Sequence, residues 1–171
     1  MKLYRKLLGE DFERLGESLR EFHESPQRVS GELDVTHSTQ LIPRIFVMLM
    51  GLPKAGTALV TTLDVSGDGE YETWTRQIGE VRLRTHQRER GGRLVEAAGP
   101  INFVFDVEEE SGALVFHHYR SEFLGIPLPK RIAPVIEARA EGLDRGWRIT
   151  VDIQCPRYGT ICRYDGVVGW E

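Results

Sequence analysis

The residues best suited to hold an anionic group lie in the segment "RLRTHQRER", residues 82–90. Five basic side chains occupy alternate positions there: Arg82, Arg84, His86, Arg88 and Arg90. On a β-strand this spacing points them to one face, where guanidinium groups can bind a carboxylate or phosphate through two parallel hydrogen bonds. The alternative is a solvent-exposed face whose arginines pair with acids of a neighbouring strand, such as Asp106 or residues 108–110.

A second candidate is the segment "YETWTRQIG", residues 71–79. Period two puts Trp74 and Arg76 on the same face, and an aromatic ring beside a guanidinium can bind a flat or anionic ligand. A plain cross-strand stack is the alternative. If the sheet closes, one row of each strand must point inward, and a polar inward row would line a ligand cavity. The predicted ligand-binding residues are Trp74, Arg76, Arg84, His86, Gln87, His118, Tyr119 and Arg120.

Metal and catalytic motifs are weak in this sequence. His117 and His118 are adjacent, so on a regular strand they point apart and cannot ligate one metal together. There is no phosphate-binding glycine loop and no nucleophile elbow, and Cys155 and Cys162 flank a probable turn without a demonstrated base. We therefore predict no metal, no cofactor and a non-catalytic function. An enzyme that uses a histidine as general base is a weaker alternative.

The elements that would position these residues follow from hydrophobic periodicity. Residues 3–23 carry apolar side chains at three-to-four spacing, which predicts an amphipathic helix that ends before Pro26. A strand is expected over 28–36, and a strongly apolar helix over 38–51.

From residue 57 to residue 169 the periodicity changes to two, with turn-forming clusters about every 10 to 15 residues. The expected strands are 57–65, 70–77, 81–89, 93–97, 101–108, 113–123, 135–142, 147–155 and 160–169. About nine or ten consecutive antiparallel strands strain an open sheet. The predicted fold is therefore α+β, an antiparallel meander curled into a barrel-like sheet and covered by two N-terminal helices.

Length and composition limit the class of protein. The 171 residues fit a single domain, 1–171. A net charge of −4 gives no global attraction to nucleic acid, and the two cysteines are too few for a disulfide scaffold, so we expect a soluble cytoplasmic protein that binds no nucleic acid. No signal peptide or transmembrane segment is predicted, because the apolar run 41–53 contains Arg44 and two prolines.

Several segments together resemble the bacterial domain-of-unknown-function family 4166. They are "LYRKLLGEDFERLGESLREFH" at 3–23, "WTRQIG" at 74–79, "THQRERGGRLVE" at 85–96, "FLGIPLPKRIAP" at 123–134 and "RYDGVVGW" at 163–170. The resemblance implies that the domain occurs alone or C-terminal to a part that looks like a saccharopine-dehydrogenase-type nucleotide-binding domain. It implies no catalytic residues. The glycine-rich fingerprint of such a nucleotide-binding domain does not occur in this chain.

The leading hypothesis is that the barrel binds a small amphipathic or anionic ligand in its interior. The competing hypothesis is an interaction module that self-associates or docks on a dehydrogenase-like protein partner through the row at 82–90 and the acidic stretch "DVEEE" at 106–110.

Overall fold

The computed structural model describes residues 2–25 and 28–170. Within these residues, ten antiparallel strands close into a barrel and one short extra strand, β8, pairs only with β7. The strands are β1 Val29–His37, β2 Gly56–Gly67, β3 Tyr71–Ile78, β4 Val81–Arg90, β5 Arg93–Ala98, β6 Ile101–Glu110, β7 Ala113–Phe123, β8 Ile126–Pro127, β9 Val135–Leu143, β10 Gly146–Cys155 and β11 Gly159–Gly169. The predicted antiparallel, barrel-like sheet is therefore confirmed.

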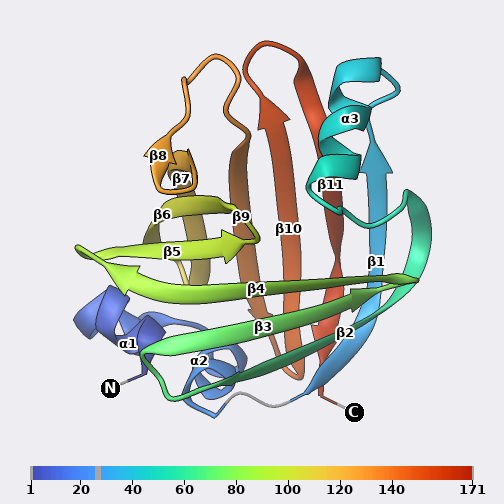
Figure 1. Ribbon diagram of the computed structural model, residues 1–171. Coiled ribbons are helices and arrows are strands. Elements are labelled where there is room, and N and C mark those ends of the chain that lie inside the picture. The colour runs from blue at the N-terminus through green and yellow to red at the C-terminus, as the bar shows by residue number, and fades with distance from the viewer. Residues whose placement is uncertain (1, 26–27, 171) are drawn as a thin grey trace.

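The ring is closed by pairing of β1 with β11, which are distant in sequence. The first and last strands pair from Ser30 opposite Gly169 to His37 opposite Cys162. Pairing of β6 with β7 connects the β1–β6 half to the half formed by β7 and β9–β11. In Figure 1, β3, β4 and β5 cross in front of the steeply running β1, β9, β10 and β11, so the two halves of the sheet enclose an interior.

Side chains alternate between the interior and the outer surface, as expected for antiparallel strands with one packed face. On β10, Trp147, Val151 and Ile153 are buried, whereas Arg148 and Gln154 are exposed. Every second side chain of a strand therefore points into the barrel interior.

The segment predicted as one helix over 3–23 is divided in the structure. It forms α1 Leu3–Leu8, a 3-10 helix at Gly9–Arg14 and α2 Glu17–Glu24. Gly9 has φ +58°, a left-handed conformation that glycine adopts easily and that ends a helix. The apolar stripe is nevertheless buried, because each piece turns its leucines and phenylalanines toward the barrel.

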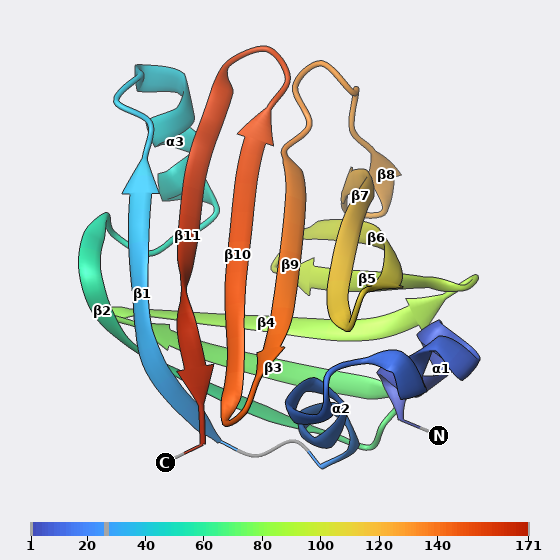
Figure 2. The ribbon, with the colours of Figure 1, turned by 180° about the vertical axis from the view of Figure 1, so that it is seen from behind.

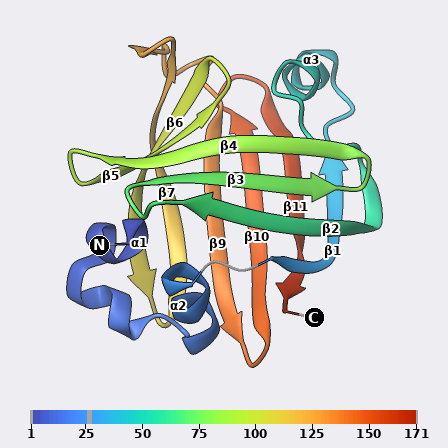
Figure 3. The same ribbon diagram turned by 60° about the horizontal axis from the view of Figure 1, so that its bottom comes forward.

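The helices lie at opposite ends of the barrel. Figures 2 and 3 show α1 and α2 across the lower end, whereas α3, Leu41–Leu49, lies at the upper end beside the tips of β1 and β11. The α3 segment, expected over 38–51, starts later because Gln40 is extended. No helix of the described residues is long and apolar enough to cross a lipid bilayer.

Candidate functional site: an apolar cavity with one polar wall

The barrel interior contains a cavity of about 480 Å³. Most of its wall is apolar and comes from both halves of the sheet and from α2; Phe22, Leu63, Phe103, Phe116 and Trp147 are examples. Binding sites for small molecules are typically concave, mainly apolar and about 300–1,000 Å³ in volume. The cavity therefore has the size and lining of such a site.

The cavity has a mouth at the end of the barrel that carries α3. The lining residues that are also exposed to solvent all lie there: Met48, Gly51, Arg82, Arg84, Gly99 and Pro100. Pairing of β4 with β5 starts only at His86 opposite Ala97, so Val81–Thr85 extends beyond the end of β5. This gap in the ring connects the interior with solvent.

A polar cluster occupies the wall formed by β3, β4 and β5. Nη1 of Arg76 donates to Thr85 Oγ1 at 2.9 Å and to Glu96 Oε1 at 3.0 Å, and Thr85 Oγ1 in turn donates to Glu96 Oε1 at 2.6 Å. The side chains of Arg76 and Glu96 are 19% and 18% exposed. Burial opposes the charge of Arg76, but Glu96 outweighs it and raises the pKa of the guanidinium. The arginine therefore stays charged inside the barrel.

Arg76 keeps hydrogen-bond donors for a further partner. Among the described residues, none accepts a hydrogen bond from its Nε or Nη2. Its Cζ lies 5.1 Å from the centre of the Trp74 ring, which also lines the cavity. The aromatic ring and the guanidinium predicted to share a face therefore meet inside the barrel.

A second polar group joins the N-terminal helices to the same wall. The Tyr4 hydroxyl donates to Gln87 Oε1 at 2.8 Å, and the Tyr4 ring lies 3.8 Å from that of His23. Burial, together with Glu72 and Glu96, raises the pKa of Tyr4 well above its usual value, and burial lowers the pKa of His23 to about 3. Both residues are therefore neutral near pH 7, and both line the cavity.

Sequence reasoning did not select Tyr4, His23, Thr85 or Glu96. The alternation along β4 contained part of the signal, because Thr85 and Gln87 belong to the row opposite the basic one. Tyr4 and His23 lie on helices whose docking site on the barrel depends on long-range packing. No pattern within residues 3–23 indicates that site.

The remaining predicted site residues lie elsewhere. Arg84 borders the mouth with an exposed side chain, and His86 is exposed on the outer face, with Nδ1 3.1 Å from Thr73 Oγ1. Tyr119 is half-exposed beneath the guanidinium of Arg93, and Arg120 pairs with Glu122 on the outer face.

His118 has an intermediate position. It is opposite Phe105 in the β6–β7 register, and its Nε2 lies 3.4 Å from Ser121 Oγ. It is not part of the cavity wall. Burial lowers its pKa to about 4, so it is a weak base near neutral pH.

The row formed by Arg82, Arg84, His86 and Arg88 points outward. Its arginines are opposite Gln77, Thr75 and Tyr71 on β3, and in the described part of the chain none of the three forms an ion pair. Pairing with acids instead involves the neighbouring Arg93, which lies 2.9 Å from Asp106. The row is thus an exposed basic strip whose first half borders the cavity mouth.

A sequence profile described as "Domain of unknown function (DUF4166)" matches residues 15–168. The chain belongs to the DUF4166 family. No curated protein matches it.

Solved structures resemble the DUF4166 barrel in fold alone. A protein of unknown function from the DUF3598 family of Nostoc punctiforme superposes with a TM-score of 0.53 at 10% identity, over 88% of this chain and 49% of that one. The present chain thus spans about half the length of that protein. An abundant heat soluble (SAHS) protein from Ramazzottius varieornatus has a TM-score of 0.45 at 10% identity, over 84% of this chain and 93% of that one.

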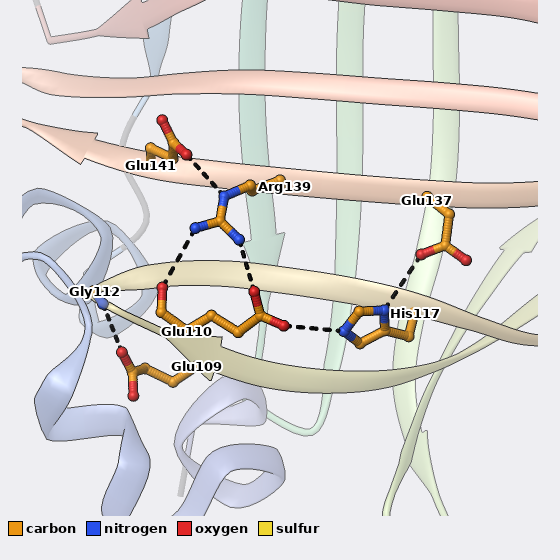
Figure 4. A network of polar contacts seen from close by, with 7 residues as sticks. All are labelled: Glu109, Glu110, Gly112, His117, Glu137, Arg139 and Glu141. Atoms are coloured by element: carbon orange, nitrogen blue, oxygen red, sulfur yellow. Dashed lines mark hydrogen bonds and ion pairs between the residues drawn. The ribbon is translucent and has the colours of Figure 1, made fainter.

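The DUF4166 chain also carries a polar network on its outer surface, over β6, β7 and β9 (Figure 4). His117 lies 3.4 Å from both Glu110 and Glu137, and Arg139 binds Glu110 at 2.9 Å and Glu141 at 2.7 Å. Glu108, Glu110 and His117 are close enough to share a cation, but Glu110 is already engaged by Arg139. We interpret the network as ion pairing across the β7–β9 seam, where only three residue pairs are in register.

Proposed function

We propose that the DUF4166 barrel binds one small amphipathic molecule, with its apolar body in the cavity and a hydrogen-bond-accepting or anionic group at Arg76. The observation that carries this proposal is the apolar cavity of about 480 Å³ that contains a charged arginine with unused donors. An arginine fork held by a partner is pre-organised to receive an acceptor, so little side-chain entropy is lost on binding.

The neighbouring side chains define the head-group site. Trp74 supplies an aromatic wall beside the guanidinium, and Gln87 directs its Oε1 to Tyr4, which leaves its Nε2 as an additional donor. We therefore propose that Trp74, Arg76 and Gln87 contact the bound ligand, and that Arg84 lies beside the mouth through which the ligand enters. Four other predicted residues, His86, His118, Tyr119 and Arg120, lie outside the cavity wall and are assigned no ligand contact.

The test is a titration with dodecanoate, an amphiphile with a carboxylate head group, followed by tryptophan fluorescence because Trp74 and Trp147 line the cavity. We expect saturable one-to-one binding. Arg76→Lys keeps the charge but loses the planar fork, and we expect about ten-fold weaker binding because hydrogen bonds to charged groups contribute about 1.5–3 kcal/mol.

The matched control is Arg88→Lys, the same substitution in the outward row of β4, which should leave the affinity unchanged. Equal affinities for the wild type and Arg76→Lys would contradict the assigned head-group site. Absence of saturable binding to the wild type would contradict the proposed function itself.

A further inference from the structure

The end of the barrel that carries the cavity mouth has an unusual charge composition. We define this mouth end as residues 38–55, 82–84, 99–100, 124–134 and 156–158. It contains no aspartate or glutamate, and its seven cations are Arg44, Lys54, Arg82, Arg84, Lys130, Arg131 and Arg157. The nearby Glu80 is engaged by Lys54 at 2.8 Å. A protein with a net charge of −4 thus presents a strongly basic end.

The segments of the mouth end are joined to one another in space. The Leu124 N–H donates to the Pro100 carbonyl at 2.8 Å, and the Cys155 thiol lies 3.9 Å from the Arg131 carbonyl. On the other side, the Ser38 N–H donates to the Ile161 carbonyl at 3.2 Å. Figures 1 and 2 both show α3 and β8 at the same end of the barrel, with the β10–β11 connection between them. The cations therefore surround one surface.

Apolar side chains project from this basic surface. On α3, Leu41, Arg44, Ile45 and Met48 recur at three-to-four spacing and are exposed, Leu41 at 72% and Met48 at 73%. The opposite face of the helix, with Phe46 and Val47, packs on the barrel. Helix α3 therefore has an unpartnered apolar face that contains one arginine.

The β7–β9 connection continues this apolar surface. Leu124 and Ile126 are each 71% exposed and Ile132 is 44% exposed, with Lys130 and Arg131 between them. Apolar side chains that project beside cations are what a protein needs to lie on an anionic bilayer, where the apolar groups enter the interface and the cations meet lipid phosphates.

The opposite end of the barrel carries both signs of charge, with a small excess of acids. Residues 9–17 contain four acids, Glu10, Asp11, Glu13 and Glu17, against Arg14, and the β2–β3 turn adds Asp68 and Glu70. Near an anionic surface this distribution turns the mouth end toward the lipid and the opposite end away from it.

We infer that the mouth end of the barrel docks on the surface of an anionic lipid bilayer, with the cavity mouth facing the lipid. The ligand of the proposed function would then pass between the bilayer and the cavity without crossing water. The transfer of a ligand rests on the proposed function. The docking itself does not, because it is argued from the charges and apolar side chains of the mouth end.

The experiment is sedimentation with vesicles of phosphatidylcholine alone and of phosphatidylcholine with phosphatidylglycerol. We expect partitioning onto the anionic vesicles only, weakened by salt. Arg44→Gln combined with Met48→Ser removes one cation and one apolar group from α3. Each cation near such a surface strengthens partitioning about five-fold, and loss of the apolar Met48 side chain weakens it further. We therefore expect partitioning to be weakened at least about ten-fold. The matched control, Arg145→Gln with Leu143→Ser, makes the same kind of change in exposed residues at the opposite end and should have no effect.

Equal partitioning onto both vesicle types, or equal loss in the two double variants, would overturn the inference. A wild-type dimer in vesicle-free solution that the α3 variant dissociates would also overturn it, because a second copy would then cover this surface. Dodecanoate binding without vesicle binding contradicts docking alone, whereas vesicle binding without dodecanoate binding contradicts the ligand function alone.

Discussion

Glu122 and Arg76 show how single charged residues are accommodated on the two faces of the barrel wall. Glu122 is 1% exposed on the outer face, and it accepts hydrogen bonds from Arg90 Nη2 at 2.6 Å and Arg120 Nε at 2.8 Å. Burial raises the pKa of this carboxyl, but the hydrogen bonds from Arg90, Arg120 and Asn102 outweigh it and leave the pKa below its usual value. The Glu122 cluster is therefore structural, whereas Arg76 faces the cavity with donors unused.

Glu122→Gln should lower the free energy of unfolding by about 2 kcal/mol at pH 7, because it replaces charge-assisted hydrogen bonds by neutral ones. The folded-state pKa lies below the unfolded value of 4.5. The contribution of the carboxylate is therefore fully present above that value and is lost as the pH falls through the folded-state pKa. Urea unfolding at a series of pH values measures it.

The control for this prediction is Glu32→Gln on the exposed surface of β1, which should change stability little at any pH. The difference in the free energy of unfolding between the wild type and Glu122→Gln should shrink as the pH falls into the acid range. If it stayed constant, the charge of Glu122 would not be the cause of the stabilisation.

The sequence allowed part of the site to be predicted at the residue scale. Period two placed Trp74 and Arg76 on one face, and it separated Gln87 from Arg84 and His86. It could not decide which row points inward, because both rows of β4 contain polar residues. The partners Glu96 and Tyr4 depend on strand register and helix docking, which join residues 20 and 83 positions apart.

At the element scale, the N-terminal helices close one end of the cavity. Phe22 of α2 is 1% exposed, lines the cavity, and its ring lies 4.5 Å from Trp147 and 5.8 Å from Trp74. The helix pieces thus contribute directly to the wall of the proposed site. Their short length indicates that packing on the barrel, rather than helix propensity, holds them in place.

Phe22→Ala should lower the free energy of unfolding by about 3–4 kcal/mol, because it removes a buried aromatic side chain and enlarges an existing cavity. Equilibrium unfolding in urea measures the change. Phe123→Ala is the control, since that side chain is 46% exposed and should cost less than about 1 kcal/mol. A loss of stability no larger for Phe22→Ala than for Phe123→Ala would show that α2 is not part of the cooperative core.

Strand positions were predictable, and helix continuity was not. The expected strands agree with β1–β7 and β9–β11 to within two residues at each end. The reason is that glycine turns with positive φ, such as those at Gly91, Gly99 and Gly112, separate clearly alternating segments. Strand β8 has two residues, too few for a pattern, and the helix break at Gly9 depends on one glycine inside an otherwise regular stripe.

At the scale of the whole molecule, closure of the sheet creates both the cavity and the two chemically different ends. Strand number favoured closure, but pairing of β1 with β11 and of β7 with β9 joins strands that do not follow one another along the chain, and no single segment indicated it. Closure also brings the acid-free segments of the mouth end together, although they are spread from residue 38 to residue 158. The basic row at 82–90 contributes through Arg82 and Arg84, which line the rim of this mouth and are exposed to solvent.

Native mass spectrometry of the protein purified from its own host tests the central claim most directly. We predict the polypeptide mass increased by one small molecule, which is released on unfolding and proves to be an amphiphile with a hydrogen-bond-accepting head group. A bare polypeptide mass, together with no saturable binding of dodecanoate, would contradict the account.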